Sequence, residues 1–249
     1  MTPLSLVLIT QDEAERLPAC LDSVPFADEV VIVDSGSRDA TVALARARGA
    51  RVIQQEWLGF GRQKQLAVTL ARNDWVLCLD ADERLSLPLQ EHMQRELRSP
   101  RCLAYRFARR NRFLGRWLRH GEGYPDYQLR LFHRGHARWS DDPIHEGVTA
   151  STPVGDLSGD LLHESAQTLE SYLAKQNRYT SLQAERLADA GKRPGPARLL
   201  LSPLFRFVKF YFLRLGFLDG LPGLIHILIG CMNSFTKYAK TLEKTLPSS

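Results

Sequence analysis

The stretch WVLCLDADE, residues 75–83, joins an apolar run to three acids that lie within four positions. The run WVLCL (75–79) carries no charged residue, which is typical of a strand that is covered on both faces of a sheet. Asp80, Asp82 and Glu83 follow it directly. Carboxylates brought together repel one another unless a cation or a ligand neutralises them. The stretch therefore predicts that a central strand ends at a ligand-binding edge.

Strand-like and helix-like patterns alternate along the first hundred residues. Strand-like runs cover 4–10, 29–35 and, more weakly, 51–57, and helical patterns lie between them at about 13–23, 39–48 and 62–72. Such alternation predicts an α/β fold with a Rossmann-like, mostly parallel sheet and flanking helices. Ligands of this architecture bind at the carboxyl ends of the strands.

Polar residues gather at that edge. Thr10 and Glu13 follow the first strand, Asp34 ends the second, and Asp80 and Asp82 follow the fourth. A single Asp is a common turn former, but several at one edge favour a binding site. Alternate residues of an extended segment face the same way, so Asp80 and Asp82 can meet one ligand. Hard oxygen donors suit Mg²⁺ or Mn²⁺ together with substrate phosphates. We therefore expect a divalent metal that holds a diphosphate.

The charge of the chain is uneven. Its formal net charge is +5 and its pI is near 9.1, and residues 101–138 hold ten Arg against two acids. Such a block favours anionic partners: nucleic acid, phosphorylated glycans or an anionic membrane. The first ten residues contain no basic residue and the four cysteines form no CxxC pair. These two features predict a protein of the reducing cytoplasm without a secretory signal.

Four motifs together resemble a known family: LSLVLITQDEAERLPACLDSV (4–24), EVVIVDSGSRDAT (29–41), GFGRQKQLA (59–67) and WVLCLDADE (75–83). In this order, at predicted strand ends, they resemble the inverting glycosyltransferases of family 2, which have the GT-A fold. A lone DxD motif is weak, whereas four motifs in sequence are specific. The resemblance implies a metal-dependent enzyme that uses a nucleotide-sugar donor.

Three further motifs extend the resemblance over most of the chain: YPDYQLRLFHRG (124–135), IHEGV (144–148) and GFLDGLPG (216–223). They look like those of small bacterial enzymes of lipopolysaccharide core assembly, of the β-1,4-glucosyltransferase type. This similarity implies transfer of a hexose, glucose from UDP-glucose, to a lipid-linked oligosaccharide acceptor.

The resemblance also implies roles for the residues at the sheet edge. Thr10 and Glu13 would line the nucleotide pocket, and Asp34 would contact the base or the ribose. Asp80 would lie near the ribose and the metal, and Lys64 would contact a phosphate. Lys64 has a simpler alternative as a solvated helix lysine.

The metal would have Asp82 as its principal ligand and Asp80 beside it. A histidine near the end of the GT-A domain completes the metal or diphosphate site in some families, which makes His163 a third candidate. A lone histidine at a strand end is also commonly structural.

Inversion in a single displacement requires a base that takes the proton of the acceptor hydroxyl. Family 2 enzymes often place an acidic base after a strand that ends in a basic turn, and LRLFHRG followed by DDPIHE fits that layout. We favour Glu146, with Asp142 and Asp126 as alternatives.

The last third differs in composition. We expect a catalytic domain over 1–165 and a helical region over 166–249, in which residues 199–240 hold five Lys or Arg and one acid among many Phe, Leu and Ile. At helical periodicity three of these cations fall within an arc of about 140°. Glycines and a proline at 216–223 break the segment into two amphipathic helices, too short and interrupted to span a bilayer. They predict association with an anionic membrane, or alternatively a hairpin packed on the catalytic domain or a second subunit.

Two other functional classes stay open on the sequence. A sugar nucleotidyltransferase shares the sheet and the metal, but it would need a Gly- and Arg-rich loop where TQDEAERL (10–17) is acidic. A non-enzymatic basic module that binds membrane or nucleic acid leaves Asp34, Asp80 and Asp82 without a purpose. We therefore predict a cytoplasmic enzyme, peripheral at the inner face of the bacterial inner membrane, without a nucleic-acid partner.

Overall fold

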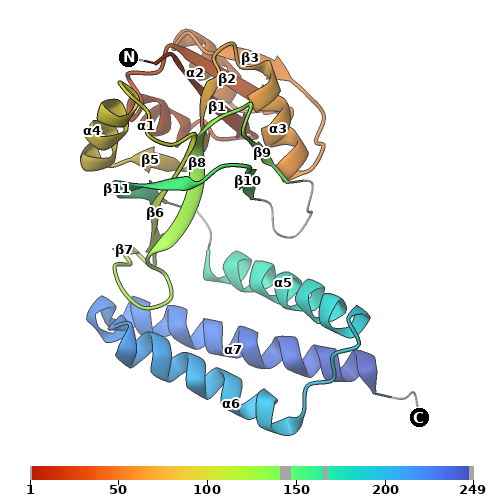
Figure 1. Cartoon of the computed structure of the whole chain (residues 1–249). Coiled ribbons are helices and arrows are strands. Elements are labelled where there is room, and N and C mark those ends of the chain that lie inside the picture. Colours follow the sequence, from red (N-terminus) through yellow and green to blue (C-terminus); the bar gives the residue numbers. More distant parts are fainter. Residues whose placement is uncertain (1, 141–146, 165–167, 247–249) are drawn as a thin grey trace. The chain divides into compact units, whose positions relative to one another are not determined.

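The computed structural model describes residues 2–140, 147–164 and 168–246. They belong to two compact units, which are labelled by element in Figure 1. The first unit holds 1–109 and 126–164, and the second holds 110–125 and 165–249. The sequence placed 110–125 in the catalytic domain, whereas this segment makes its contacts with the C-terminal helices.

The first unit is built on a mixed sheet. Its strands are β1 (Leu4–Thr10), β2 (Glu29–Asp34), β3 (Arg51–Gln54), β4 (Trp75–Asp80), β5 (Glu83–Leu85), β6 (Ala104–Phe113), β8 (Asp126–His133) and β11 (Val154–His163). They lie in the order β3-β2-β1-β4-β8-β6-β11-β5. From β3 to β4 the pairing is parallel, and β8 joins β4 and β6 antiparallel, as β11 joins β5. The α/β prediction is confirmed, and its parallel part is limited to the first four strands.

Helices cover both faces of the parallel part. Leu6 and Leu8 of β1 pack into a cluster with α1 (Leu17–Asp22) and α4 (Leu87–Glu96), and Ala45 of α2 (Thr41–Ala47) joins it. Val7 points to the other face, where α3 (Phe60–Leu70) packs. Because both faces are buried, the strands are apolar without alternation, as the sequence indicated.

Two small strands, β9 (Ala137–Trp139) and β10 (Val148–Ala150), form a separate antiparallel pair in the first unit. Trp139 of β9 packs in the cluster beneath α3. Its backbone N–H donates to Gln65 Oε1 at 2.9 Å, which ties the pair to α3.

The second unit is helical. It comprises α5 (Leu169–Asp189), α6 (Pro196–Phe207), a π turn over Val208–Leu213, a 3-10 turn over Gly216–Asp219 and α7 (Gly220–Thr245), with the short strand β7 (Arg116–Trp117) against the end of β6. α7 packs along both α5 and α6. The chain reverses at Leu215, whose φ of 54° lies in the left-handed region. The predicted break into two helices is therefore confirmed.

The expectation that the last segment is too interrupted to span a bilayer needs correction. Gly220, Pro222 and Gly223 lie in the first turn of α7, where a proline without an N–H is tolerated. Within the described residues, one helical stretch, Gly216–Thr245, is long and apolar enough to cross a membrane by length and composition, and 39% of its apolar window is buried. The same length and composition also fit a core helix.

Candidate active site

The predicted polar residues meet at one edge because of the strand register. Thr10 lies opposite Asp34 in the β1–β2 pair, and Ile9 lies opposite Asp80 in the β1–β4 pair. The three strands therefore end side by side. The loops that follow them form the walls of this carboxyl edge.

Asp34 is fully buried and holds the loop that follows β2. Its carboxylate accepts hydrogen bonds from Thr10 Oγ1 at 2.8 Å, Gly36 N at 3.0 Å and Ser37 N at 2.9 Å. Thr10 is itself only 4% exposed. In this structure both side chains are buried and support the loop at the carboxyl edge. Their contact with a nucleotide stays a prediction.

The loops after β1 and β2 are joined by further bonds that the sequence did not predict. Asp12, with a positive φ of 55°, accepts from Arg38 N at 2.7 Å. Ala14 N donates to Asp39 Oδ2 at 3.0 Å. Asp12 and Asp39 therefore hold the two loops together, in the way Asp commonly does in turns. Their spacing in TQDEA and GSRDA is a turn signal, but their pairing across 25 or more residues is not visible in the sequence.

Glu13 faces the edge and binds Arg16, with Nη2 at 2.6 Å from Oε2. Burial raises the pKa of Glu13, and although Arg16 opposes this, the pKa stays above its ordinary value, with Asp82 adding to the rise. A raised pKa to which Asp82 contributes indicates that the Glu13 and Asp82 carboxylates share one electrostatic environment.

Asp80 is held between two cations. Lys64 Nζ lies 2.9 Å from one of its oxygens and Arg130 Nη2 lies 3.1 Å from the other. Burial would raise the pKa of Asp80, but these two cations outweigh it and hold the pKa well below its usual range. Lys64 is 6% exposed, so the alternative of a solvated helix lysine is wrong. Its contact with a phosphate stays a prediction.

A partly buried chain of ion pairs continues from Asp80 to the next strands. The Glu83 carboxylate accepts from Asp80 N at 3.0 Å, while Arg130 and Arg109 lie 3.4 and 3.3 Å from its Oε1. Arg109 then binds Asp126, 2.7 Å away. Glu83 has no exposed side-chain surface. The acid that follows DAD is thus a structural link between β4, β6 and β8.

Trp139 closes this arrangement from the side of β9. Lys64 Nζ lies 4.7 Å and the Arg130 guanidinium 5.1 Å from the centre of its ring. Its indole N–H donates to Cys78 Sγ at 3.4 Å. Sequence analysis missed Arg109, Arg130 and Trp139. An arginine inside the apolar run LRLF (129–132) was the one signal that could have identified Arg130.

Asp82 and His163 form the exposed part of the edge. His163 Nε2 lies 3.2 Å from Asp82 Oδ2, and the two side chains are 23% and 20% exposed. Burial would raise the pKa of Asp82, but the hydrogen bond and charge of His163 lower it overall. Glu164 N donates to Asp82 O at 3.0 Å, which aligns the end of β11 with the DAD turn. The structure therefore brings the predicted pair together.

The donors at this edge fit a metal site of low protein coordination. Among the described residues, no group of three or more His, Cys, Asp or Glu side chains is arranged to hold a metal ion. Asp80 is already neutralised by Lys64 and Arg130. Asp82 and His163, which contact each other, are both partly exposed. Mg²⁺ commonly uses one or two protein ligands with substrate phosphates completing its shell.

Of the three candidate bases, Asp126 alone lies in the part of the chain that the structure describes. Asp126 is 32% exposed at the start of β8 and is bound to Arg109. Glu146 and Asp142 lie outside the described residues.

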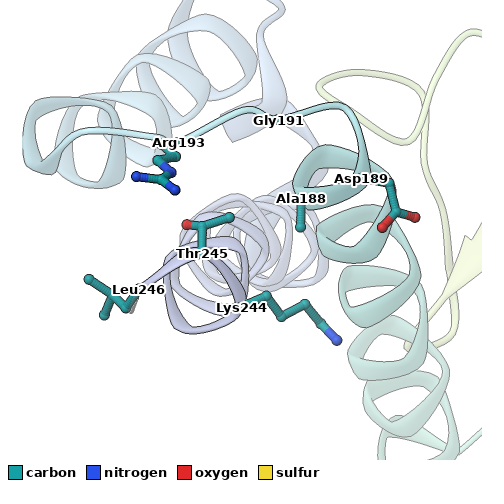
Figure 2. Close-up of a pocket in the computed structure, with 7 residues that line it drawn as sticks. All are labelled: Ala188, Asp189, Gly191, Arg193, Lys244, Thr245 and Leu246. Atoms are coloured by element: carbon teal, nitrogen blue, oxygen red, sulfur yellow. The ribbon is translucent and has the colours of Figure 1, made fainter. Parts of the chain in front are cut away.

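An open pocket of about 460 Å³ lies in the second unit, at the ends of α5 and α7 (Figure 2). Its lining residues are Ala188, Asp189, Gly191, Arg193, Lys244, Thr245 and Leu246. None of them belongs to the carboxyl edge. In Figure 2 the Arg193 and Asp189 side chains lie on different sides of the opening.

A model of the family described as glycosyl transferase family 2 matches residues 5–152, which include the parallel strands except for Leu4, the first residue of β1. The chain belongs to glycosyl transferase family 2. This membership agrees with the resemblance noted in the sequence and decides for a glycosyltransferase over the nucleotidyltransferase and the non-enzymatic module.

Curated relatives of this family 2 glycosyltransferase match over nearly the whole chain. It is 32% identical over 250 residues to the "Lipopolysaccharide core biosynthesis glycosyltransferase LpsC" of Rhizobium meliloti, covering 97% of this chain and 93% of the relative. It is 33% identical to an uncharacterized glycosyltransferase of Rickettsia felis, covering all of this chain and 92% of the relative.

Solved structures share the fold of this family 2 enzyme. The mannosyltransferase PcManGT of Pyrobaculum calidifontis, in complex with GDP-Man and Mn²⁺, has a TM-score of 0.53 at 17% identity and covers 99% of this chain and 89% of its own. The S. aureus TarS fragment 1–349 with UDP-GlcNAc has a TM-score of 0.52 at 13% identity, with 98% and 89% covered. At these identities the likeness concerns the fold alone.

Proposed function

We propose that this family 2 glycosyltransferase moves a hexose, glucose from UDP-glucose, with inversion onto a lipid-linked acceptor in the assembly of a lipopolysaccharide core. The observation that carries the donor half is the exposed Asp82–His163 pair at the carboxyl edge. The acceptor half is supported by the similarity to LpsC over nearly the whole chain. The place of action is the cytoplasm, at the inner face of the inner membrane.

A divalent metal, Mg²⁺ or Mn²⁺, would be held by Asp82 and His163. When bound, it would stabilise the charge of the departing nucleoside diphosphate. The PcManGT complex with Mn²⁺ shares only the fold with this chain, so the proposal rests on the donor pair of this chain.

The chain's own residues would orient the donor. Asp34 holds the loop after β2 through Gly36 and Ser37, which gives the nucleotide a rigid wall. Lys64 and Arg130 hold positive charge beside Asp80, where a diphosphate would gain electrostatic stabilisation. Fixed groups of this kind need little reorganisation during the reaction.

The reaction would proceed as one displacement. The acceptor oxygen forms a bond to the anomeric carbon while the bond from that carbon to the diphosphate oxygen breaks, and the hydroxyl proton goes to a carboxylate base. Glu146 is the first candidate for this base, and Asp142 and Asp126 are the alternatives. Asp126 is the least favoured of the three, because Arg109 already binds it.

Calorimetric titration of the full chain with UDP, UDP-glucose and GDP-mannose, with and without Mn²⁺, tests the donor half. We expect Mn²⁺-dependent binding of the two uridine ligands and much weaker binding of GDP-mannose. Transfer of labelled glucose to purified, truncated lipopolysaccharide tests the acceptor half. Folded protein that binds no nucleotide under any of these conditions would refute the donor assignment.

A further inference from the structure

An exposed apolar face runs along α6 and the turns that follow it. Its side chains are between 40% and 73% exposed, and they are Leu200, Leu201, Leu204, Phe205, Val208, Phe212, Leu213, Leu215, Phe217, Leu218 and Leu221. The first six recur at helical spacing, since residues four apart lie on one side of a helix. A surface of this length is far more apolar than the scattered side chains of an ordinary soluble surface.

The hairpin of segment 110–125 adds to this face from a distant part of the sequence. Leu114 at its tip is 50% exposed. Arg116 Nη2 donates to Leu218 O at 2.8 Å, and Gly121 N donates to Arg214 O at 2.8 Å. We call the apolar face together with Leu114 the docking surface. Figure 1 labels β7 of this hairpin, and also α6 and α7, which lie before and after the turns of the docking surface.

The hairpin is held in place by a buried aspartate. Asp219 is 2% exposed and accepts from Arg119 N at 2.9 Å and His120 N at 2.8 Å. Glu122 binds Arg206 of α6, with Oε2 at 3.0 Å from Nε. The two acids nearest the docking surface are therefore engaged inside the unit.

The border of the docking surface is positive. Its exposed cations are Arg112, Arg116, Arg119, Lys209 and Arg214. The sequence has no acid at all from residue 190 to residue 218. Apolar side chains that are bordered by cations without exposed acids match a lipid surface with negative headgroups.

We propose that the docking surface lies on an anionic lipid bilayer, with its Leu and Phe side chains at the headgroup–acyl boundary and its cations at the headgroup phosphates. This inference deepens the proposed function, on which it rests for the lipid-linked acceptor, and it assigns membrane contact to the middle hairpin as well as to the C-terminal helices. A second copy of the chain fits less well, because in a two-fold interface the same cations would face one another.

Flotation of the full chain with phosphatidylcholine vesicles, with and without about a quarter phosphatidylglycerol, tests the proposal. We expect binding to the anionic vesicles only. The double variant Phe212→Ser/Leu213→Ser should lower the partition about tenfold or more, since exposed side chains lose their apolar burial in the bilayer. Leu114→Ser, in the hairpin, should lower it several-fold.

Matched controls lie in the first unit. Leu87 is 71% exposed on α4, and Leu87→Ser should leave the partition unchanged. Arg112→Glu/Arg116→Glu should weaken binding to anionic vesicles about tenfold or more, whereas Arg98→Glu, at another exposed arginine, should weaken it much less.

The outcomes separate the two proposals. Equal partition of wild type and the docking-surface variants, with UDP binding intact, would overturn the membrane surface and leave the transferase assignment standing. A change from dimer to monomer in those variants, measured by sedimentation, would also overturn it and would identify the surface as a self-association interface. Loss of UDP binding in wild type would refute the proposed function instead.

Discussion

The carboxyl edge of the first unit and the docking surface of the second unit both carry many charged residues, but they differ in how these charges are arranged. At the edge, Asp80, Glu83 and Asp126 each have cationic partners inside the unit. On the docking surface, exposed cations border apolar side chains, Glu122 binds Arg206, and Asp219 is buried. Internal pairing fixes geometry for a small ligand, whereas exposed positive charge beside exposed apolar surface suits an anionic partner outside the molecule.

The two regions also differ in where their stability comes from. In the chain of ion pairs of the first unit, the Glu83 and Arg130 side chains are buried, so each depends on its partners for neutralisation. The apolar side chains of the docking surface are already exposed to water, so they contribute little to the free energy of unfolding. Substitutions should therefore affect folding at the edge and binding at the surface.

Asp82→Ala should have the largest effect and tests whether the edge is the donor site. We expect transfer to fall by at least about 10³-fold, because the charge of the leaving diphosphate would lose its stabilisation. Mn²⁺-dependent UDP binding, followed by calorimetry, should fall as well. Asp74→Ala, at the other end of β4 and 66% exposed, is the matched control. Full activity in Asp82→Ala would remove the metal from this position.

Glu146→Gln separates the base from the donor site. We expect kcat to fall by about 10²- to 10⁴-fold with unchanged UDP binding, because a carboxamide cannot accept the acceptor proton. Asp142→Asn and Asp126→Asn should keep most of the activity. If Asp142→Asn is inactive while Glu146→Gln is active, the base is Asp142.

Glu83→Gln tests whether the edge depends on internal pairing. Removal of this buried charge leaves Arg109 and Arg130 without their shared acid, and we expect the free energy of unfolding to fall by about 3 kcal/mol. Urea denaturation measures the change. Glu91→Gln, at an exposed position of α4, should change it by less than about 0.5 kcal/mol. Equal stability of both variants would show that the chain of ion pairs is not needed for the fold.

Gly230→Ala makes the corresponding change in the second unit, with a smaller expected effect. A methyl group at this position of α7 would overlap Glu122 Oε2, so we expect a cost of about 1–3 kcal/mol in unfolding free energy. Displacement of Glu122 should also loosen the hairpin and reduce vesicle partition. Gly195→Ala, where nothing lies within 4 Å of the added carbon, is the control. Unchanged partition in Gly230→Ala would show that Glu122 does not hold the hairpin in its binding position.

Local patterns were sufficient for the elements of the first unit but not for their ends. The apolar runs at 4–10, 29–35 and 75–79 became β1, β2 and β4. The helical pattern at about 39–48 became α2, which begins at Thr41, while Ser37 shortly before it donates to Asp34 and accepts from Asp12 N. A serine shortly before a helix can cap that helix or bind a neighbouring loop. The tertiary structure decides between these two roles.

By itself, the sequence determined the strand–helix alternation, the edge at which Asp34, Asp80 and Asp82 gather, and the break in the C-terminal helices. These features follow from local periodicity and from strand direction, which act over a few residues. Only the tertiary structure decided that Asp80 is neutralised by Lys64 and Arg130, and that segment 110–125 packs with the C-terminal helices. Such pairings join residues 16 to 102 positions apart, and they depend on burial and on which strands and helices become neighbours.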